Sequence, residues 1–451
     1  MNEEPEYGPK ANAFKTLVSK IYLHRLPSYG NKIFYGLGFL ALTSLVLLII
    51  SGSVLAFMGQ DWWLHDPVGI YARSVHLWSV QAFIAILILH ILVGFFTSGY
   101  RPPRRMVWVF GAAIFALVVF QTEFGYGLRG DFSSQFRAVS GADFWNGARL
   151  GYWINPLSHL QEFALHVAII PLSILGLFVL HYILIHAYGI SKPLKKETPY
   201  RMVDANHRIM WTRGAFLAAA ILVLAFFFHS PYVPVSTIAD SAKADASLVS
   251  STLTDEYART SDTATYLDSI DPYAFDTRTV YVVAPYEALS GATEATTSDA
   301  MIAALMPAVE NGTYEAYLDR ADPAPYTYSL RFLSDMGVLE ERAGTLGFAT
   351  DQWGMAKDEN GHYLNALPPG SWWMTPLGVL NSSFNLLNND NGDEIAAYTF
   401  AIILLLFIVF PYVPILNRLP ELFPFGGWIQ RDKSLSEGGG DASDHVTPPP
   451  L

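Results

Sequence analysis

The sequence contains no cysteine among its 451 residues. This absence excludes disulfides, iron–sulfur ligation by the chain and covalent cofactor attachment through a Cys-X-X-Cys-His motif. The first 32 residues are polar and lack a short apolar stretch before a small-residue cleavage site, so we expect no cleaved signal peptide. We also find no phosphate-binding loop, nucleophile triad or nucleic-acid-binding patch, and we therefore expect no nucleic-acid partner.

Long apolar runs dominate what is present. Hydrophobic residues make up 51% of the chain and charged residues only 15%. Runs of about 20 apolar residues can cross the hydrocarbon core of a membrane, and helices are the expected spanning structures. Six such runs predict a polytopic membrane protein, at residues 35–58, 80–96, 107–120, 166–185, 214–228 and 397–416.

The distribution of charge predicts an orientation. Basic residues cluster before the first run, between the second and third, between the fourth and fifth, and after the sixth. If the runs alternate in direction, all four clusters lie on one side, which should be the cytoplasmic side. We therefore expect a bacterial-type inner membrane protein with both termini in the cytoplasm.

The connection before the last run differs in composition from the rest. Residues 231–395 carry 24 acidic and 7 basic side chains, a balance of −17, although the whole chain is only −12. Amphipathic patterns at 298–320 and 328–342 indicate helices, so this connection should be a folded domain outside the membrane. Its charge could serve solubility alone or could steer a basic redox partner to the protein.

These boundaries give the predicted domain organisation. We expect a cytoplasmic N-terminal segment at residues 1–32, a four-helix core at 33–215 and a fifth span at 214–230. The acidic domain should follow at 231–395, the sixth span at 396–416 and a cytoplasmic tail at 417–451.

Four histidines lie on two predicted helices that include the second and fourth apolar runs. His76 and His90 are fourteen residues apart, and His166 and His181 are fifteen apart. At about 1.5 Å and 100° per residue, each pair shares one helix face and spans roughly 21 Å. Two spans of the same direction would pair His76 with His166 outside and His90 with His181 inside. Each pair could supply two axial imidazoles to one haem iron; a structural or metal-transport role for the histidines is the alternative.

Glycines repeat the same axial step. Gly38 and Gly52 are fourteen apart in the first run, and Gly111 and Gly125 are fourteen apart in the third. A planar macrocycle between helices needs backbone without side chains at its own height, although small residues also favour membrane helix packing in general.

Three arginines are candidates for contacts with haem propionates. Arg73 precedes His76 by one turn and should lie at the outer surface. Arg101 and Arg104 should lie at the inner surface.

Together these residues resemble the cytochrome b of quinol–cytochrome c reductases, in particular its plastid and cyanobacterial b–f branch. The similar segments are "RSVH" with His90 and "GYR", "FYGLG", "FGYGL" and "ALHVAIIP" with His181 and "GISKPL". The resemblance is specific over residues 30–215 and weaker over the fifth run and residues 365–430. It implies an all-α membrane protein, a cytochrome b-type dihaem bundle with two haem b groups and quinone or quinol as substrate, usually in a dimeric complex.

The sequence departs from this family on the outer side. The family's outer quinol site uses a Pro-Glu-Trp-Tyr segment, whereas the nearest segment here is "PPGSWW" (Pro368–Trp373), which has no glutamate. Gly36 stands where the b–f branch has a cysteine that holds a further haem. Glu123, near the outer end of the third run, could replace the missing proton acceptor or could simply be a satisfied polar group.

The inner side keeps more of the family pattern. His186 matches the quinone-contacting histidine of the inner site, and Asp204 falls one residue from the position of its aspartate. Both could contact quinone and deliver protons, or both could be ordinary interface residues.

Two functional hypotheses follow from these observations. The first is the cytochrome b subunit of a respiratory or photosynthetic bc-like complex, with Rieske and c-type cytochrome partners. The second is a dihaem membrane anchor that connects an outer oxidoreductase, of molybdoenzyme or multihaem type, to an inner quinone site. Both make the chain an electron-transfer subunit in contact with membrane lipid, and the sequence leaves its enzymatic status open.

Overall fold

The computed structural model describes residues 25–193, 200–259, 276–291, 297–321, 327–346, 372–374 and 392–432. Most of the predicted N-terminal segment, the residues 368–371 of "PPGSWW" and the tail from residue 433 lie outside the described residues. The described chain is almost entirely helical, which confirms the all-α membrane fold predicted from the sequence.

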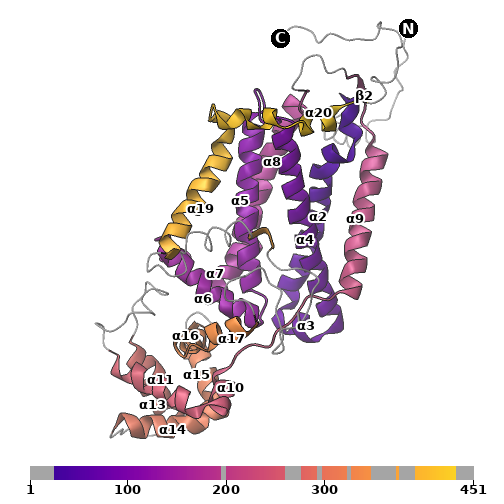
Figure 1. Cartoon of the computed structure of the whole chain (residues 1–451). Helices are drawn as coiled ribbons and strands as arrows, with labels where there is room; N and C mark the ends of the chain where they lie inside the picture. Colours follow the sequence, from indigo (N-terminus) through magenta and orange to yellow (C-terminus); the bar gives the residue numbers. More distant parts are fainter. Residues whose placement is uncertain are drawn as a thin grey trace, which may run out of the picture.

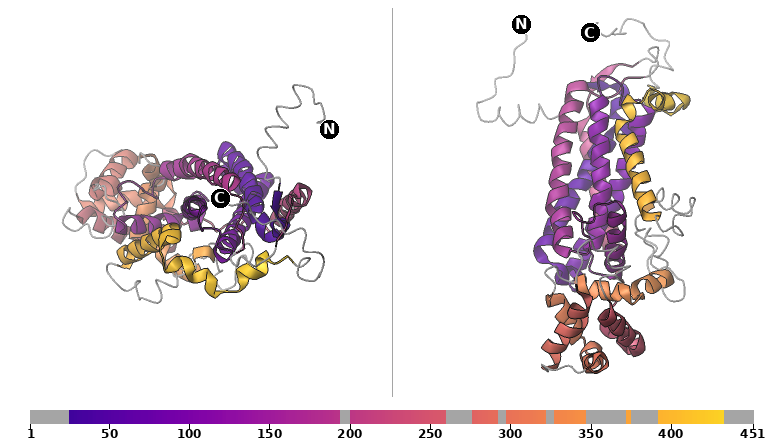
Figure 2. Two further views of the ribbon diagram at one scale, coloured as in Figure 1. Left: turned by 90° about the horizontal axis from the view of Figure 1, so that it is seen from above. Right: turned by 90° about the vertical axis from the view of Figure 1, so that its left-hand side faces the viewer.

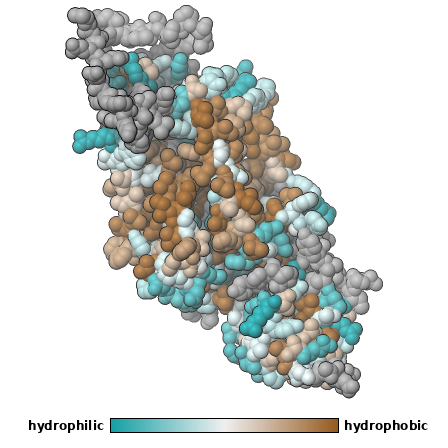
Figure 3. Space-filling view, turned by 180° about the vertical axis from the view of Figure 1, so that it is seen from behind, coloured by the Kyte–Doolittle hydropathy of each residue, from teal (hydrophilic) through white to brown (hydrophobic). Residues whose placement is uncertain are grey.

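Long apolar helices form a bundle in which they run side by side (Figure 1). Five are long and apolar enough to cross a membrane. They are α2 (Ile33–Met58), α4 (Pro67–Phe96), α5 (Arg105–Gly127), the continuous span of α7 (His159–Ala164), η2 (Leu165–Ile169) and α8 (Ile170–Tyr188), and α9 (His207–Phe227). The face seen in Figure 3 carries a hydrophobic belt over the bundle, as expected for a surface that lies in lipid.

The four-helix core consists of α2, α4, α5 and the α7–α8 span. Helix α2 packs against α4, α5 packs against α8, and α4 joins the two pairs through α5. Helix α9 lies outside this core against α2 and α4. It begins at His207, seven residues before the predicted start of the fifth span.

Local sequence fixes where α4 begins. Short helix α3 (Gln60–His65) precedes it, and the Asp66 carboxylate accepts hydrogen bonds from the N–H groups of Val68 and Gly69. Pro67 occupies the first turn, where its missing N–H costs nothing. A side chain at Gly69 would collide with the Trp62 carbonyl, so this glycine permits the close turn that leads into the histidine-bearing helix.

The sixth predicted span corresponds to α19 (Gly392–Val409), which lies against α5. The chain continues through η6 (Phe410–Tyr412) and bends by 77° before η7 (Leu416–Leu422). The helical segment therefore ends short of the predicted boundary at residue 416. Helix α20 (Phe425–Gln430) then crosses the end of the bundle (Figure 1).

The two ends of the bundle are structurally distinct. At one end, which we call the sheet end, η1 (Ser28–Asn31) follows β1 (Arg25–Pro27), which pairs antiparallel with β2 (Met202–Asp204). The other end carries a separate group of helices, and we call it the domain end (Figure 2).

The helical domain at the domain end is built from short amphipathic elements. Its helices are α10 (Ile238–Ala244), α11 (Ala246–Ala258), η3 (Thr279–Val283), α13 (Ala284–Ser290), α14 (Ser298–Glu310), α15 (Thr313–Ala321), α16 (Thr327–Asp335) and α17 (Val338–Leu346). They share a buried apolar core with α6 (Phe132–Gly147), the helix that follows α5. Helix α6 therefore connects the domain to the membrane bundle.

Glycines divide each of the two amphipathic segments predicted in this domain. The segment 298–320 breaks at Gly312, and the segment 328–342 breaks at Gly337, where the backbone φ angles are 82° and 72°. These left-handed conformations favour glycine, so each predicted helix becomes a helix pair.

A buried carboxylate makes the stability of this domain depend on pH. The Glu315 carboxylate accepts a hydrogen bond from the Ile238 N–H at 2.9 Å, but burial raises its pKa to about 7. The folded state then binds the proton more tightly than the unfolded state, whose glutamate has a pKa of about 4.3. The free energy of unfolding should therefore fall as pH rises from about 4.5 to about 7.

The substitution Glu315→Gln should remove this fall, because the amide oxygen can still accept from Ile238 and does not titrate. We expect the Tm of the full chain in detergent to decrease less between about pH 5 and pH 8 than it does in the native chain. Glu310→Gln, at an exposed position of α14, is the control and should keep the native decrease. An unchanged pH profile in Glu315→Gln would contradict the assignment.

Candidate functional site

Two pairs of histidines lie inside the four-helix core. The rings of His76 and His166 have centroids 6.3 Å apart and an interplanar angle of 73°. His90 and His181 lie within electrostatic range of each other further along the same helices. Helix α4 thus supplies one member of each pair and the α7–α8 span supplies the other, which is the arrangement predicted from the spacing.

A π turn explains why the two helices use different histidine spacings. His166 lies in η2, where the Ile170 N–H bonds to the Leu165 carbonyl, five residues back. Pro171 follows and lacks the N–H that would continue the regular pattern. The wider turn accommodates one extra residue, so the fifteen-residue step in this span can match the fourteen-residue step of α4.

Backbone carbonyls fix the orientation of two of the imidazoles. The Nδ1 atoms of His166 and His181 lie 2.8 Å from the carbonyl oxygens of Gln121 and Val107. A carbonyl only accepts hydrogen bonds, so Nδ1 carries the proton in both rings and Nε2 keeps its lone pair. This is the tautomer that a metal ligand needs.

Ser51 does the same for His76. Its hydroxyl donates to the Leu47 carbonyl at 2.6 Å and lies 2.9 Å from His76 Nδ1. Because the single hydroxyl proton goes to Leu47, the oxygen accepts from Nδ1–H. Nε2 of His76 is again the atom left with a lone pair.

Each of the four predicted glycines faces one of these histidines. A β-carbon on Gly38 would lie 3.3 Å from His90 Cε1, and β-carbons on Gly52 and Gly111 would lie 3.0 Å from Cε1 of His76 and His181. A β-carbon on Gly125 would collide with His166. The glycines therefore make room for the imidazole edges themselves, in addition to any bound group.

The geometry of the first pair fits a shared metal ion. An imidazole nitrogen lies roughly 1.1 Å from its ring centroid, and metal–imidazole bonds are about 2 Å, so two ligands on opposite sides of one ion have centroids about 6 Å apart. The observed separation of 6.3 Å for His76 and His166 agrees with this value. The donor set and the glycine backbone beside it fit a haem with two axial histidines.

Two arginines lie at the domain end of the bundle, on the side of the His76–His166 pair. Arg73 is buried and donates to the Ser230 carbonyl at 2.9 Å, while its Nε and Nη1 have no hydrogen-bond partner among the described residues. Arg129 donates to Asp131 and to the Pro231 carbonyl, and its charge acts on Arg73. The buried, unpartnered donors of Arg73 suit an anionic group. Arg129 was not predicted from the sequence, because no motif marks it.

The arginines predicted for the other haem have partners elsewhere. Arg101 forms an ion pair with Glu421. Arg104 is buried and donates to the carbonyls of Gly99 and Ile190 at 3.3 and 3.4 Å.

His186 and Asp204, the predicted inner quinone-site residues, both lie at the sheet end. His186 Nε2 is 3.0 Å from the Tyr182 hydroxyl, one helical turn away on α8. Asp204 is exposed in β2, where it lies opposite Arg25 of β1 in the register of the two-stranded sheet.

Two carboxylates lie close together at the domain end. Glu123 forms an ion pair with Arg137 at 2.8 Å. Glu162, on α7, is buried against the backbone of Gly127 and interacts electrostatically with Glu123. It also lines a cavity of about 440 Å³ that extends to Glu315 of the helical domain. Glu162 was not predicted from the sequence, because only the fold brings α7 against the end of α5.

Two tryptophans of the "PPGSWW" segment lie against the core near this end. Trp372, in η4 (Trp372–Met374), donates through Nε1 to the Gln81 side chain at 2.8 Å. The Trp373 and Tyr126 rings have centroids 6.4 Å apart.

Comparison with known proteins agrees with this architecture. The family model described as cytochrome b (N-terminal)/b6/petB matches residues 81–237. Cytochrome b6 of Heliobacterium modesticaldum is 29% identical over 197 residues, 38% of this chain and 91% of that protein. Cytochrome b6 of Heterocapsa triquetra is 30% identical over 195 residues, 38% of this chain and 89% of that protein.

Two further comparisons involve a subunit of a cytochrome bc1 complex and a solved structure. The cytochrome b subunit of the Mycobacterium leprae cytochrome bc1 complex is 31% identical over 173 residues, 35% of this chain but 31% of that subunit. A solved chain titled "Hyperthermophilic respiratory Complex III" aligns with 92% of this chain and 98% of its own length, at 18% identity and a TM-score of 0.40.

The fold and the comparisons define an all-α integral membrane protein of the b-type cytochrome class. The chain belongs to the cytochrome b family of the bc and b6f complexes. Membership gives it a general role in membrane electron transfer and implies that it binds haem b.

The contact between Gly125 and His166 can be tested by a single methyl group. Gly125→Ala should force the His166 ring from its position and lower the Tm of the purified chain, since overpacking a filled site costs about 1–3 kcal/mol. Gly176→Ala, on α8, meets nothing within 4 Å and should leave the Tm unchanged or raise it. Equal Tm values for the two variants would refute the proposed close contact.

Proposed function

We propose that this chain is a dihaem b-type cytochrome that carries electrons across a membrane between the quinone pool and a redox partner on the domain side. One observation carries this proposal: α4 and the α7–α8 span together form two histidine pairs, His76 with His166 and His90 with His181. A glycine of a neighbouring helix lies against each of the four rings. Three of the four rings have Nδ1 bound to a protein oxygen, as ligands require.

The chain's own residues would hold one haem at each level. His76 and His166 would ligate the haem near the domain end, and His90 and His181 would ligate the second. When bound, each haem supplies a one-electron carrier whose potential depends on its axial ligands and surroundings. Arg73, with two unpartnered donors, would neutralise a propionate of the first haem.

The orientation follows from charge. We assign the sheet end to the cytoplasm of a bacterial-type membrane, because basic residues cluster there, and the acidic helical domain to the outside. A negatively charged domain next to the first histidine pair could steer a basic partner such as a c-type cytochrome, with a Rieske protein as the other expected partner.

Quinone would be bound at one or both ends. His186, on the last turn of α8, and Asp204 are our candidates for the sheet end. At the domain end, Glu162 is a better candidate than Glu123 for accepting a quinol proton. The Glu123 carboxylate is paired with Arg137, whereas Glu162 lines the cavity that leads to the helical domain.

The alternative function is a dihaem membrane anchor of an extracytoplasmic oxidoreductase, with a quinone site at the sheet end alone. The absence of glutamate before Trp372 and Trp373 favours this alternative, because these tryptophans lie where the family's outer quinol segment is expected. The role of Glu162 separates the two functions.

The haem assignment makes a stoichiometric prediction. His76→Ala should remove the haem near the domain end, so the pyridine haemochrome count should fall from two per chain to about one while a reduced b-type optical band persists. His65→Ala is a matched control, because His65 is an exposed histidine at the same domain end. In the described part of the chain its side chain interacts with Asp61. An unchanged haem count in His76→Ala would refute the ligand assignment.

The proton-acceptor assignment predicts a kinetic effect. Glu162→Gln should slow quinol-driven haem reduction by about 10²-fold or more, because a positioned base is lost, while haem content stays at two per chain. Glu310→Gln, on the exposed surface of the domain, should keep the native rate. A native rate in Glu162→Gln would favour the membrane-anchor alternative.

A further inference from the structure

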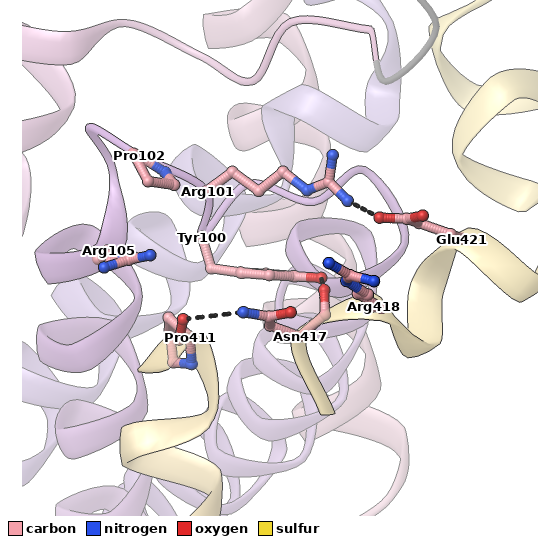
Figure 4. A pocket seen from close by; sticks show the side chains of 8 residues that line it. All are labelled: Tyr100, Arg101, Pro102, Arg105, Pro411, Asn417, Arg418 and Glu421. Atoms are coloured by element: carbon pink, nitrogen blue, oxygen red, sulfur yellow. Dashed lines mark hydrogen bonds and ion pairs between the residues drawn. The ribbon is translucent and has the colours of Figure 1, made fainter. Parts of the chain in front are cut away.

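A basic cavity lies at the sheet end, away from both histidine pairs. It has a volume of about 420 Å³ and lies between the α4–α5 connection and the chain that follows α19 (Figure 4). Arg101 and Arg105 line it from the side of the α4–α5 connection, and Arg418 and Glu421 line it from the chain that follows α19.

The charges in the cavity are not balanced. Glu421 is occupied by its ion pair with Arg101, which leaves the guanidinium groups of Arg105 and Arg418. Neither of these two has a carboxylate partner among the described residues, and Arg105 Nε is buried without a hydrogen-bond acceptor. In Figure 4 the two groups lie on opposite sides of the cavity, with the Tyr100 ring between them. A site with this charge and these donors suits a phosphate group.

The walls of the cavity are held in place by contacts between the two segments. The Tyr100 hydroxyl donates to the Asn417 carbonyl, and Tyr100 itself is only 1% exposed. The Arg105 guanidinium lies over the Tyr412 ring, 5.1 Å from its centroid. A ligand here would meet donors whose positions are largely fixed before it binds.

The surroundings of the cavity distinguish a lipid from a free anion. Arg105 is the first residue of α5, so the cavity lies at the level where a membrane span begins. Exposed apolar side chains are found next to its lining residues, Met106 beside Arg105 and Leu419 and Leu422 beside Arg418 and Glu421. Ile415, the most exposed of this stretch at 79%, extends the apolar surface. Acyl chains could lie along these side chains while the headgroup phosphate occupies the cavity.

We propose that this cavity binds the phosphate headgroup of an anionic phospholipid of the cytoplasmic leaflet. Arg105 and Arg418 contact the phosphate, and the apolar residues beside them contact the chains. The lipid bridges the start of α5 and the segment after α19, so it fastens the last span to the four-helix core. This inference is independent of the haem and quinone assignments.

The test compares lipid binding by the native full chain and by the double variant Arg105→Gln/Arg418→Gln. After delipidation in detergent, phosphatidylglycerol is added and binding is measured by native mass spectrometry. A loss of about fivefold for each arginine predicts roughly 25-fold weaker phosphatidylglycerol binding by the double variant. The charge-retaining variant Arg105→Lys/Arg418→Lys should keep most of the affinity. The control Arg201→Gln/Arg208→Gln, at exposed sheet-end positions, should bind as the native chain does.

Three outcomes would overturn the proposal. Equal phosphatidylglycerol binding by the native chain and the Arg105→Gln/Arg418→Gln variant would show that the cavity is not the site. Equal binding of phosphatidylcholine by the native chain would show that the charge is irrelevant. Displacement of phosphatidylglycerol by millimolar inorganic phosphate, with equal protection of the Tm by phosphate alone, would identify a free-anion site. A native Tm of each delipidated variant verifies that the fold is intact.

Discussion

The close approach of glycine backbone to a histidine ring is the constraint on which the rest of the core depends. Each of the four rings has its Cε1 edge against a glycine of the neighbouring helix, where even a methyl group would be too near. This contact brings α2 against α4 and α5 against α8. Helix packing and the placement of the histidine rings are therefore consequences of one steric arrangement.

The same backbone also sets the chemistry of the rings. Val107 and Gln121 lie four residues before Gly111 and Gly125, and their carbonyls accept the Nδ1 protons of His181 and His166. A glycine thus opens the surface of α5, and the carbonyl one turn earlier selects the tautomer. The π turn at His166 then aligns the longer spacing of the α7–α8 span with α4. Small backbone features thereby orient His166 and His181 in a span whose local geometry differs from that of α4.

The ends of the bundle serve different purposes. The domain end gathers buried arginines, paired carboxylates and a cavity that continues into the helical domain, through α6 as the shared packing element. The sheet end is basic and joins the last span to the core through contacts such as that of Tyr100 with Asn417. The family membership places the chain among electron-transfer proteins.

The sequence by itself determined the membrane class and predicted the pairing of the histidines, because apolar length and helical periodicity are local properties that survive without tertiary information. The family was indicated by the resemblance of its short motifs to those of cytochrome b. The sequence also located the glycines, but not their function of accommodating the imidazole edges. Only the tertiary structure brought Glu162 against Gly127, placed Arg129 beside Arg73, paired Arg101 with Glu421 and divided the domain helices at Gly312 and Gly337. These features depend on contacts between residues far apart in the chain or on the backbone conformation of single residues, and neither follows a periodic pattern.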